Sequence, residues 1–594
     1  MIGRYPGNGQ IESGLRKIGI SVTLLLIVCH STSLSAGSPE PARPSVSRTM
    51  ALSSSLPSAP MTGAAVGLRT AAAPVAVPSA AKKQPPQGGR LVMGVASWGV
   101  ENPFAWHQQT GDKRLWDHMY DTLIDRDPET AEKRPGLAEW KPSKDHKTWT
   151  FKLRQGVQFH DGWGELTSED VKFTLEQHLK PGATGAGVFW VKQVIERIET
   201  PDKYTLVLYL KYPTWDVPLQ FSRGLGYMTI SSKRYLQSLG EEKARLHPVG
   251  SGPFRYVEGR QGDYHRFEAI PNHWLQTAGF RELLIRLIPE QSVAVSALRA
   301  GEVDIIPVTG DFLKQAKQEG FRIHEIAGGL QYWIALPGQT FPDKRDYCPT
   351  CPWVGDPKDP KSQENARKVR MALNLAVNKR AIVDKLWSGH GSLDPFGLYY
   401  YPNQPGFSKE WKIPPYDPQG AKQLLAEAGY PKGFEITLAL RGHMGDAPDV
   451  GEAVALDWER IGIKVKRHEE PWSTLLPKVR RRNTGGVAVF QTGRFSDEPV
   501  ILLDRTTSSW GAFNFAAETP EYDQMIKVLL KEFDPAQRAQ LHRQLAQKMY
   551  DDVRVVMIGW KSNTFAISKR IARWRTVYGA PSENNLDYIT WSGQ

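Results

Sequence analysis

The sequence predicts an α/β protein with more than one domain, on the strength of three observations. The chain has 594 residues, which is more than a single hydrophobic core usually holds. Its content of 40% hydrophobic and 10% aromatic residues is typical of a folded protein rather than a disordered one. From residue 90 onward, short apolar strand patterns alternate with amphipathic helix patterns, and this order favours sheets covered by helices.

The individual elements are predicted from hydrophobic spacing and from the residues that begin them. A buried-type strand at 91–95 comes first, followed by an amphipathic helix at 116–124. Strict alternation predicts a strand at 149–153, and Thr167 with the acidic residues after it predicts the start of a helix. The later strands are predicted at 205–210, 434–440, 464–469 and 487–491. The later helices are predicted at 293–300, 366–377, 418–428, 450–461 and 536–550.

The N-terminus carries an export signal. Arg16 and Lys17 precede an apolar run at 18–29, which has the length of a signal-peptide core and is too short to span a bilayer comfortably. Small residues follow, so we predict cleavage near Ala36 and a signal peptide at 1–36. A lipid anchor on Cys29 is the alternative, although Val28 is larger than the residue that normally precedes a lipidated cysteine. A retained membrane anchor is a third reading.

The composition changes abruptly between residues 37 and 89. Ala, Pro and Ser supply 28 of these 53 residues, and no apolar periodicity is visible. Such a segment buries too little surface to offset its ordering entropy, so we predict a disordered linker. Residues 1–89 also hold 8 Lys/Arg against 2 Asp/Glu, which leaves a net charge of only about +6 on the remainder. This mild charge argues against nucleic acid as a partner.

The stretch from 134 to 173 carries a longer pattern. It reads RPGLAEWKPSKDHKTWTFKLRQGVQFHDGWGELTSEDVKF and resembles the signature of the family 5 extracellular solute-binding proteins, the dipeptide, oligopeptide and nickel receptors of ABC importers. That signature is P-x-L-A-x-x-W, W-x-F-x-L-R-x-G-V-x-F-H-D-G and T-A-E-D-V-x-F. Later segments at 249–254, 272–274, 297–304, 369–380 and 416–430 are similar to further family patterns. The resemblance runs from about residue 90 to the last few tens of residues.

The resemblance implies a particular fold. It is the two-lobed periplasmic binding protein fold, type II (cluster C), with an extra subdomain in the first lobe. Carried over, lobe I comprises 90–133, 209–328 and 554–594, the extra subdomain 134–208, and lobe II 329–553. The hinge is then expected near Gly328 and Gly329, with the return crossing at 552–556.

Sequence patterns for catalysis are absent. The chain contains no G-x-S-x-G, H-E-x-x-H or G-x-x-x-x-G-K-[ST] pattern, and its 14 histidines show no metal-ligand spacing, so we predict no enzyme activity, cofactor or metal. Cys348 and Cys351 stand in a C-P-x-C sequence, as in thiol oxidoreductases. Pro352 and further turn residues follow at once, so a structural disulfide in a loop is favoured over redox catalysis or a metal site.

Aromatic residues supply the candidate ligand contacts. The chain has 19 Trp and 20 Tyr, and binding clefts favour these side chains because they offer apolar walls with a polar handle. We select four: Trp98, after the first strand; Trp333, just past the expected hinge; Tyr400, in a run of three tyrosines; and Trp510. In the family, the loop after strand one and the start of lobe II face the cleft.

One departure from the family bears on the ligand. Its peptide receptors commonly carry an acidic residue in a W-x-A-D-Y-x-x-P segment, which pairs with the peptide ammonium. The matching stretch here reads FQTGRFSDEP at 490–499; it places Phe495 at the acidic position, with Arg494 beside it and Asp497 out of register. Asp497 suits an ammonium and Arg494 suits a carboxylate or phosphate. That Arg494 is a surface residue is the equal alternative.

Together these patterns predict an exported, non-enzymatic and monomeric receptor in the periplasm. It would bind a peptide or peptide-sized polar solute between two lobes and deliver it to an ABC permease in the inner membrane. A sensory or chaperone-like protein of the same fold is the alternative. A secreted hydrolase or thiol oxidoreductase is a less favoured one.

Overall fold

The computed structural model describes residues 88–344, 347–395, 398–401, 404, 406–442, 446–493, 498–580 and 582–592. The predicted signal peptide, Cys29 and nearly all of the 37–89 linker lie outside these residues. No helix in the described part of the chain combines the length and apolar character needed to cross a membrane.

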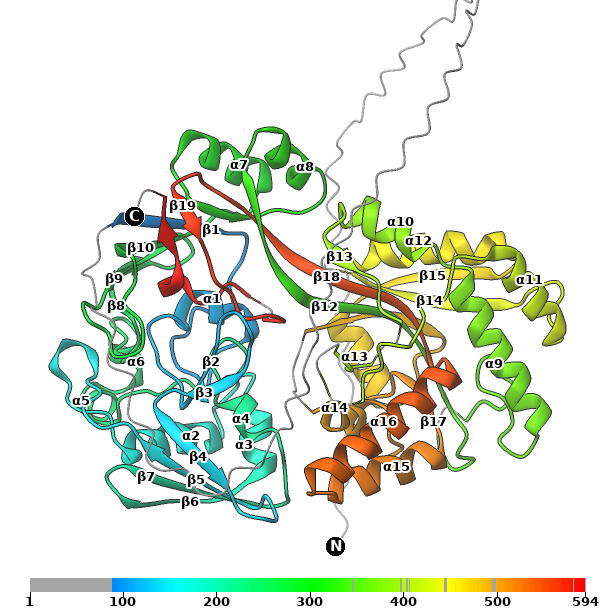
Figure 1. Cartoon of the computed structure of the whole chain (residues 1–594), viewed down its shortest axis with the longest axis horizontal. Helices are drawn as coiled ribbons and strands as arrows, with labels where there is room; N and C mark the ends of the chain where they lie inside the picture. The colour runs from blue at the N-terminus through cyan, green and yellow to red at the C-terminus, as the bar shows by residue number, and fades with distance from the viewer. Residues whose placement is uncertain are drawn as a thin grey trace, which may run out of the picture. The chain divides into compact units, whose positions relative to one another are not determined.

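One large mixed sheet organises the described chain (Figure 1). Its strand order is β15 (Lys464–Pro471), β14 (Glu435–Gly442), β16 (Val487–Thr492), β12 (Arg322–Gln339), β18 (Val555–Ile567), β11 (Ile305–Pro307), β1 (Gly88–Val95), β10 (Phe280–Leu287), β9 (Tyr264–Ala269) and β8 (Phe254–Arg260). The short strands β13 (Gly391–Ser392) and β17 (Ala516–Glu518) pair with β18 and β12. We call the part built on β1 and β8–β11 lobe I, and the part built on β14–β16 lobe II.

Lobe I has its own apolar core. Leu91, Met93, Phe280 and Leu283 are fully buried on one side of the sheet. On the other side α7 (Gln291–Ala300) and α8 (Gly310–Gln318) pack through residues such as Leu298. The C-terminal elements β19 (Ile571–Arg573), η4 (Leu586–Tyr588) and β20 (Thr590–Trp591) return to this lobe, and Trp591 joins its core.

A second, four-stranded antiparallel sheet forms the subdomain. Its order is β4 (Ala138–Pro142), β5 (Thr148–Leu153), β7 (Thr205–Leu210) and β6 (Ile195–Asp202). The helix α2 (Ser168–Leu179) begins where its sequence predicts, because Thr167 caps it and the Asp170 carboxylate accepts the Thr167 N–H at 2.9 Å. The shared core also takes in residues from Phe104 to Val249, so it extends beyond the predicted range 134–208. Its other elements are β2 (Ile124–Arg126), β3 (Lys133–Pro135), α3 (Val188–Val194), α4 (Val217–Gln220), α5 (Lys233–Leu239) and α6 (Glu241–Ala244).

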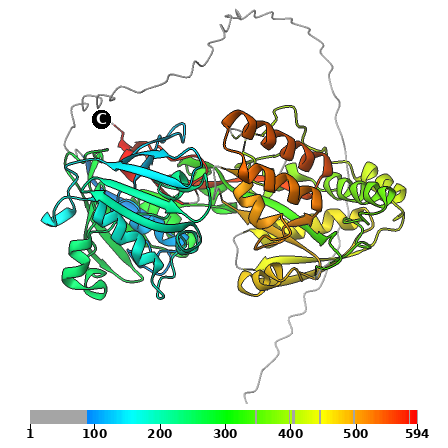
Figure 2. The same ribbon diagram turned by 90° about the horizontal axis from the view of Figure 1, so that it is seen from below.

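Helices cover both faces of the lobe II sheet. The elements are α9 (Pro360–Leu375), α10 (Lys379–Ala381), η3 (Ile382–Leu386), α11 (Pro418–Glu427), α12 (Ala447–Arg460), α13 (Trp472–Arg480), α14 (Pro499–Thr506), α15 (Pro520–Lys531) and α16 (Pro535–Asp552). One core lies under α9, α11 and α12, and another lies under α14 to α16. Figure 2 shows α15 and α16, in orange and dark orange, side by side. The helices predicted at 366–377, 418–428, 450–461 and 536–550 are all confirmed.

The helix predicted at 116–124 is wrong. Only Lys113–Trp116 is helical (α1, after η1 at Thr110–Asp112), and the chain then turns and enters β2 at Ile124. Trp116 and Met119 are buried in the lobe I core, whereas Leu123 and Ile124 are buried in the subdomain core. The apolar spacing therefore arises because this segment packs between two cores and not on one helix face.

The strands β12 and β18 run from lobe I into lobe II. Their ladder is irregular between Ile326 and Leu330, where Ala327, Gly328 and Gly329 interrupt the pairing. Leu330 pairs with Lys561 and Ile326 with Asn563, so the crossing opposite the glycines lies at 561–563 and not at the expected 552–556. Gly328 has φ +69°, a conformation that costs a side chain about 1–2 kcal/mol.

We predict that Gly328→Ala lowers the free energy of unfolding by more than this backbone cost alone. A Cβ at Gly328 would lie 2.6 Å from the Tyr578 ring, which must move to accept it. The matched control is Gly301→Ala, since Gly301 has φ +75° and open space around its Cα. Urea unfolding should show a loss of about 1–2 kcal/mol for the control and roughly 1–3 kcal/mol more for Gly328→Ala. Equal losses would contradict the tight contact.

Candidate ligand-binding cleft

A cavity of about 290 Å³ lies between the subdomain and lobe II. Two separate stretches of chain line it, 186–227 from the subdomain side and 399–515 from lobe II. The lining residues are Ala186, Phe189, Trp190, Asp216, Gln220, Leu225, Tyr227, Tyr399, Thr492, Leu502, Arg505, Thr506, Phe513 and Phe515. A cavity shared by two separately packed parts of a protein is a common form of ligand site.

Short helices present the polar groups of the cavity. On the subdomain side, α3 carries Phe189 and Trp190, and Asp216 stands at the N-cap of α4. On the lobe II side, α14 begins with Pro499 at its first turn and carries Arg505 in its last turn. Each helix is anchored by buried apolar neighbours, such as Val191 in α3 and Leu503 in α14, so the lining groups are held in place.

Stacked aromatic rings build the lobe II wall. The rings of Phe513 and Phe515 stack at 5.6 Å, and Phe515 contacts Phe490 at 4.2 Å. Trp333 stacks on Phe490 at 5.9 Å, so it supports this wall from inside the core. An aromatic wall offers a large apolar area with few rotamers to freeze on binding.

Two residues of opposite charge and a tryptophan also line this apolar space. Asp216 is 5% exposed, and the Arg505 guanidinium lies 5.0 Å above the ring of Phe189 across the cleft. The Trp190 indole N–H is buried and has no acceptor among the described residues. Burial raises the pKa of the Tyr399 hydroxyl, so this group stays protonated. The cavity can therefore accept an acidic group, a basic group and an aromatic or aliphatic body.

The two sides also meet beside the cavity. Trp215 of the subdomain lies under Arg538 of α16, at 4.3 Å, and stacks on Phe533 at 5.9 Å. His146 packs on the same Phe533 ring at 5.6 Å, and burial, followed by Arg538, lowers the pKa of its imidazole. These contacts join the subdomain to lobe II directly, so the structure has a closed cleft.

None of the described residues selected from the sequence lines the cavity. Trp98 is half-buried in lobe I and donates its indole N–H to Glu101. Trp333 and Tyr400 are fully buried in the lobe II core, although Tyr399, the neighbour of Tyr400, does line the cavity. Trp510 is 43% exposed and donates to Asp504 at 2.7 Å. Their role as ligand contacts stays a prediction.

Arg494 and Asp497 lie outside the described residues, so their predicted roles also stay predictions. Thr492, two residues before Arg494, lines the cavity. Cys348 and Cys351 are joined by a disulfide, with their Cα atoms 5.3 Å apart, in the loop that leads from β12 to α9. Within the described ranges, no group of three His, Cys, Asp or Glu residues is arranged to hold a metal ion.

Sequence reasoning missed Asp216, Arg505 and the whole subdomain side of the cavity. Asp216 stands in a TWDVP sequence and Arg505 in an ordinary amphipathic helix, and neither pattern indicates a ligand. The wall at 513–515 carries a clearer signal, since two phenylalanines stand in alternate positions on either side of Asn514.

Two lobes joined by crossing strands, with a cavity between separately packed parts, define a solute-binding protein. Residues 132–514 match the model of the bacterial extracellular solute-binding proteins, family 5, and the chain belongs to this family. The resemblance seen in the sequence is thereby confirmed, as is the α/β two-lobed fold.

Named relatives agree with this assignment. The chain is 26% identical over 454 residues to heme-binding protein A of Haemophilus influenzae. The aligned region covers 72% of this chain and 78% of the relative. The chain is 25% identical over 476 residues to the dipeptide-binding protein of Escherichia coli, covering 74% and 83%. The solved structure of HbpA2 from Haemophilus parasuis superposes with a TM-score of 0.69 at 22% identity, covering 83% of this chain and 99% of that one. At that identity the structural likeness concerns the fold alone.

Proposed function

We propose that this protein is the extracytoplasmic receptor of an ABC importer and that it captures a small peptide or a peptide-sized zwitterion in the cleft. The observation that carries the proposal is the cavity itself, which is built from both the subdomain and lobe II. A ligand that contacts both sides stabilises the closed form, because it binds that form better than the open one. The closed receptor then crosses the periplasm and delivers the ligand to a permease in the inner membrane. The ligand is not changed chemically.

The chemistry of the cavity supports a peptide. A free peptide carries an ammonium and a carboxylate, and Asp216 and Arg505 supply the opposite charges for these two ends. The aromatic wall at Phe513 and Phe515 suits an apolar side chain between them. The volume of about 290 Å³ lies just below the roughly 300–1,000 Å³ range of ligand pockets, which favours a dipeptide or tripeptide. The Escherichia coli relative is a dipeptide-binding protein, which supports the same substrate class.

The test is native mass spectrometry of the full chain, first as purified from a bacterial envelope and then after incubation with an equimolar pool of dipeptides and tripeptides. We expect bound masses from the free peptide pool. We expect none from the same pool after N-acetylation, because acetylation removes the ammonium. Binding of both pools alike would contradict the assignment of Asp216, and binding of neither pool would contradict the peptide proposal.

We predict that Arg505→Gln weakens binding of the tightest peptide by about tenfold or more, because a charge-assisted hydrogen bond contributes roughly 1.5–3 kcal/mol. Removal of the carboxylate by amidation of the peptide should weaken binding to the normal chain by a similar factor. It should have little further effect on Arg505→Gln. Calorimetric titration of the four combinations measures this coupling, and additive losses would show that Arg505 does not contact the carboxylate.

A further inference from the structure

A second cavity, of about 420 Å³, lies entirely within lobe II. It is lined by residues of α9, of the end of α16 and of the start of β18, and by Pro395, Leu398 and Pro414. Its lining residues are Arg367, Met371, Asn374, Pro395, Leu398, Pro414, Met549, Tyr550, Asp551, Asp552, Val553, Arg554, Val555 and Met557. None of them lines the cleft cavity, so the two cavities have separate walls.

Most of this wall is apolar and adaptable. Met371, Met549 and Met557 come from three different elements, and thioether side chains adjust readily to an irregular apolar guest. Leu398 adds a branched aliphatic side chain. The main chain turns sharply at Val553, whose φ of +52° is uncommon for a β-branched residue. The cavity thus offers a tail site of aliphatic character.

A buried guanidinium stands at one side of the cavity. Arg554 is 6% exposed; its Nε donates to the Tyr522 hydroxyl at 3.3 Å, and its Nη2 donates to Asp552 Oδ2 at 3.2 Å. Its Nη1 is buried and has no acceptor among the described residues. Buried donors in proteins normally have a partner, so a side chain that lines a cavity with an unused donor indicates a ligand atom that accepts.

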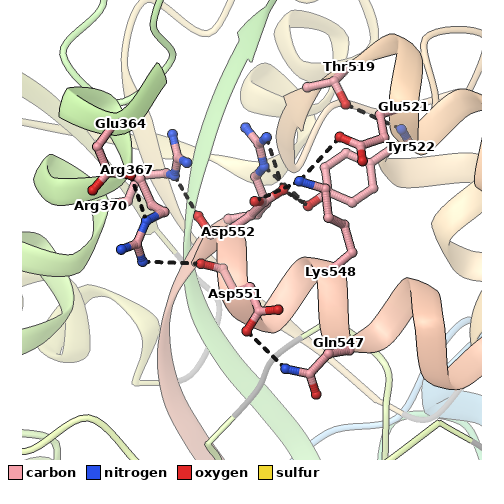
Figure 3. A network of polar contacts seen from close by, with 11 residues as sticks. Glu364, Arg367, Arg370, Thr519, Glu521, Tyr522, Gln547, Lys548, Asp551 and Asp552 are labelled. Carbon is pink, nitrogen blue, oxygen red and sulfur yellow. Dashed lines mark hydrogen bonds and ion pairs between the residues drawn. The ribbon is translucent and has the colours of Figure 1, made fainter. Parts of the chain in front are cut away.

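A second buried guanidinium, that of Arg370, adds positive charge next to Arg554. Arg370 lies beside it, 2% exposed, and its Nε donates to the main-chain oxygen of Asp552 at 2.8 Å (Figure 3). Burial, followed by the nearby Arg554, lowers the pKa of Arg370 to about 9. The Asp552 carboxylate is thus paired with both Arg554 and Lys548, and Arg370, which donates to the main-chain oxygens of Asp552 and Trp353, adds a further buried positive charge.

The other charged groups of this network lie at or near the surface, and Lys548 reaches from there to the Asp552 carboxylate at 3.0 Å. Arg367 contacts Glu364 at 3.2 Å, and Lys548 contacts Glu521 at 3.2 Å (Figure 3). The exposed carboxylate of Asp551 accepts a hydrogen bond from Gln547 at 2.9 Å and lines the cavity as well. With Asp551 and Asp552 in the wall, a doubly charged anion is repelled more strongly than a singly charged one.

We propose that the lobe II cavity binds an aliphatic monocarboxylate, with its carboxylate on the Arg554 Nη1 donor and its tail among the methionines. Arg367, which is 43% exposed, stands at the wall where the ligand can enter. The site is independent of the peptide proposed for the cleft, because the two share no lining residue.

The experiment is a calorimetric titration of the full chain with sodium octanoate. We expect saturable binding of one octanoate per chain. Acetate lacks the tail and 1-octanol lacks the charge, so each should bind at least about tenfold more weakly. Equal binding of octanol, or tighter binding of inorganic phosphate, would overturn the proposal.

Two variants test the placement. Arg554→Lys keeps the charge but removes the Nη1 donor, and it should weaken octanoate binding by about tenfold or more. Met371→Trp fills the cavity from a half-exposed position and leaves the buried network intact, so it tests the site even if Arg554→Lys does not fold. It should abolish octanoate binding and keep peptide binding in the cleft. Unchanged octanoate affinity in Met371→Trp would overturn the proposal.

The cleft variant Arg505→Gln serves as the matched control. It should leave the octanoate affinity within about twofold of the normal chain, since Arg505 lies in the other cavity. Loss of octanoate binding in this variant would place the carboxylate in the cleft and would overturn the assignment to lobe II.

Discussion

Asp587→Asn is expected to lower the free energy of unfolding by about 3–5 kcal/mol, the cost of leaving a buried charge without its partner. Asp587 is 1% exposed and forms an ion pair with Arg223, whose side chain is 12% exposed. Burial alone would lower the pKa of Arg223, but Asp587 and Asp125 together raise it above the ordinary value. An arginine side chain is not deprotonated in proteins, so the guanidinium stays charged when Asp587 is neutralised.

The ion pair connects distant parts of the chain. Asp587 belongs to η4 near the C-terminus, and Arg223 follows α4 in the segment that carries one side of the cleft. The Arg223 guanidinium also lies 5.7 Å from the ring of Tyr588, whose hydroxyl accepts from Arg134 at 2.8 Å. Loss of Asp587 should therefore loosen both the C-terminal segment and the subdomain side of the cleft.

The matched control is Glu129→Gln. Glu129 pairs with Arg573 of the same C-terminal region, but both side chains are more than half exposed. Such surface pairs contribute roughly 0–1 kcal/mol. Urea unfolding followed by tryptophan fluorescence measures both variants, and a loss of less than about 1 kcal/mol in Asp587→Asn would show that the buried pair is solvated.

Helices and strands with a regular apolar spacing were predictable from the sequence, because each of them packs one face on a single core. Helices α11, α12 and α16 each bury one face on the sheet of lobe II, so their apolar residues recur at helical spacing. The edge strand β15 and its neighbour β14 likewise follow their predicted ranges. In these elements, local spacing and tertiary packing require the same pattern.

The long crossing strands were not predictable in this way. In β12 the residues from Tyr332 to Gln339 are all buried, because the strand lies in the middle of the sheet between two cores. A strand covered on both faces shows no alternation, so its sequence gives no period to detect. The same holds for β18, which is buried along most of its length.

The family was predictable from the sequence, and the cavity was not. The family pattern at 134–173 shapes the subdomain sheet and α2, which are local structures. The cavity arises where Phe189 and Asp216 meet Arg505 and Phe515, which lie 289 to 326 residues later in the chain. Aromatic content could not separate the wall from the core, since Trp333 packs behind the wall with the same kind of ring.

Stability should fall steeply as the pH falls from about 6.5 toward 4. His118, His160 and His178 are at most 6% exposed, and burial lowers their pKa values to about 3, 4 and 4. Their folded-state pKa values lie below the unfolded value near 6.5, so the unfolded chain binds more protons in this range. The contribution is fully present above pH 6.5 and is lost as the pH falls. Each histidine steepens the loss of the free energy of unfolding by about 1.4 kcal/mol per pH unit, and the three together by about 4 kcal/mol per pH unit.

Buried carboxylates act in the opposite direction, so the test compares variants and not absolute slopes. Burial raises the pKa of Asp117 and of Asp125, and the folded state therefore takes up protons more readily at these groups as the pH falls. His178→Asn keeps a donor near Nδ1, which bonds the Thr174 main-chain oxygen at 2.8 Å, and removes only one titration. The free energy of unfolding of this variant, measured in urea at pH 6 and at pH 5, should still fall as the pH falls. This fall should be smaller than in the normal chain by about 1.4 kcal/mol per pH unit.

The control for this comparison is Leu175→Ala in the same helix. Leu175 is fully buried, and its truncation should lower the free energy of unfolding by about 2–5 kcal/mol at every pH. Because no proton is gained or lost at this position, the pH slope should stay that of the normal chain. If His178→Asn and Leu175→Ala had the same slope, the buried imidazole would already be charged in the folded state. A shallower slope in His178→Asn alone would show that the fold holds His178 neutral, as its burial on the inner face of α2 requires.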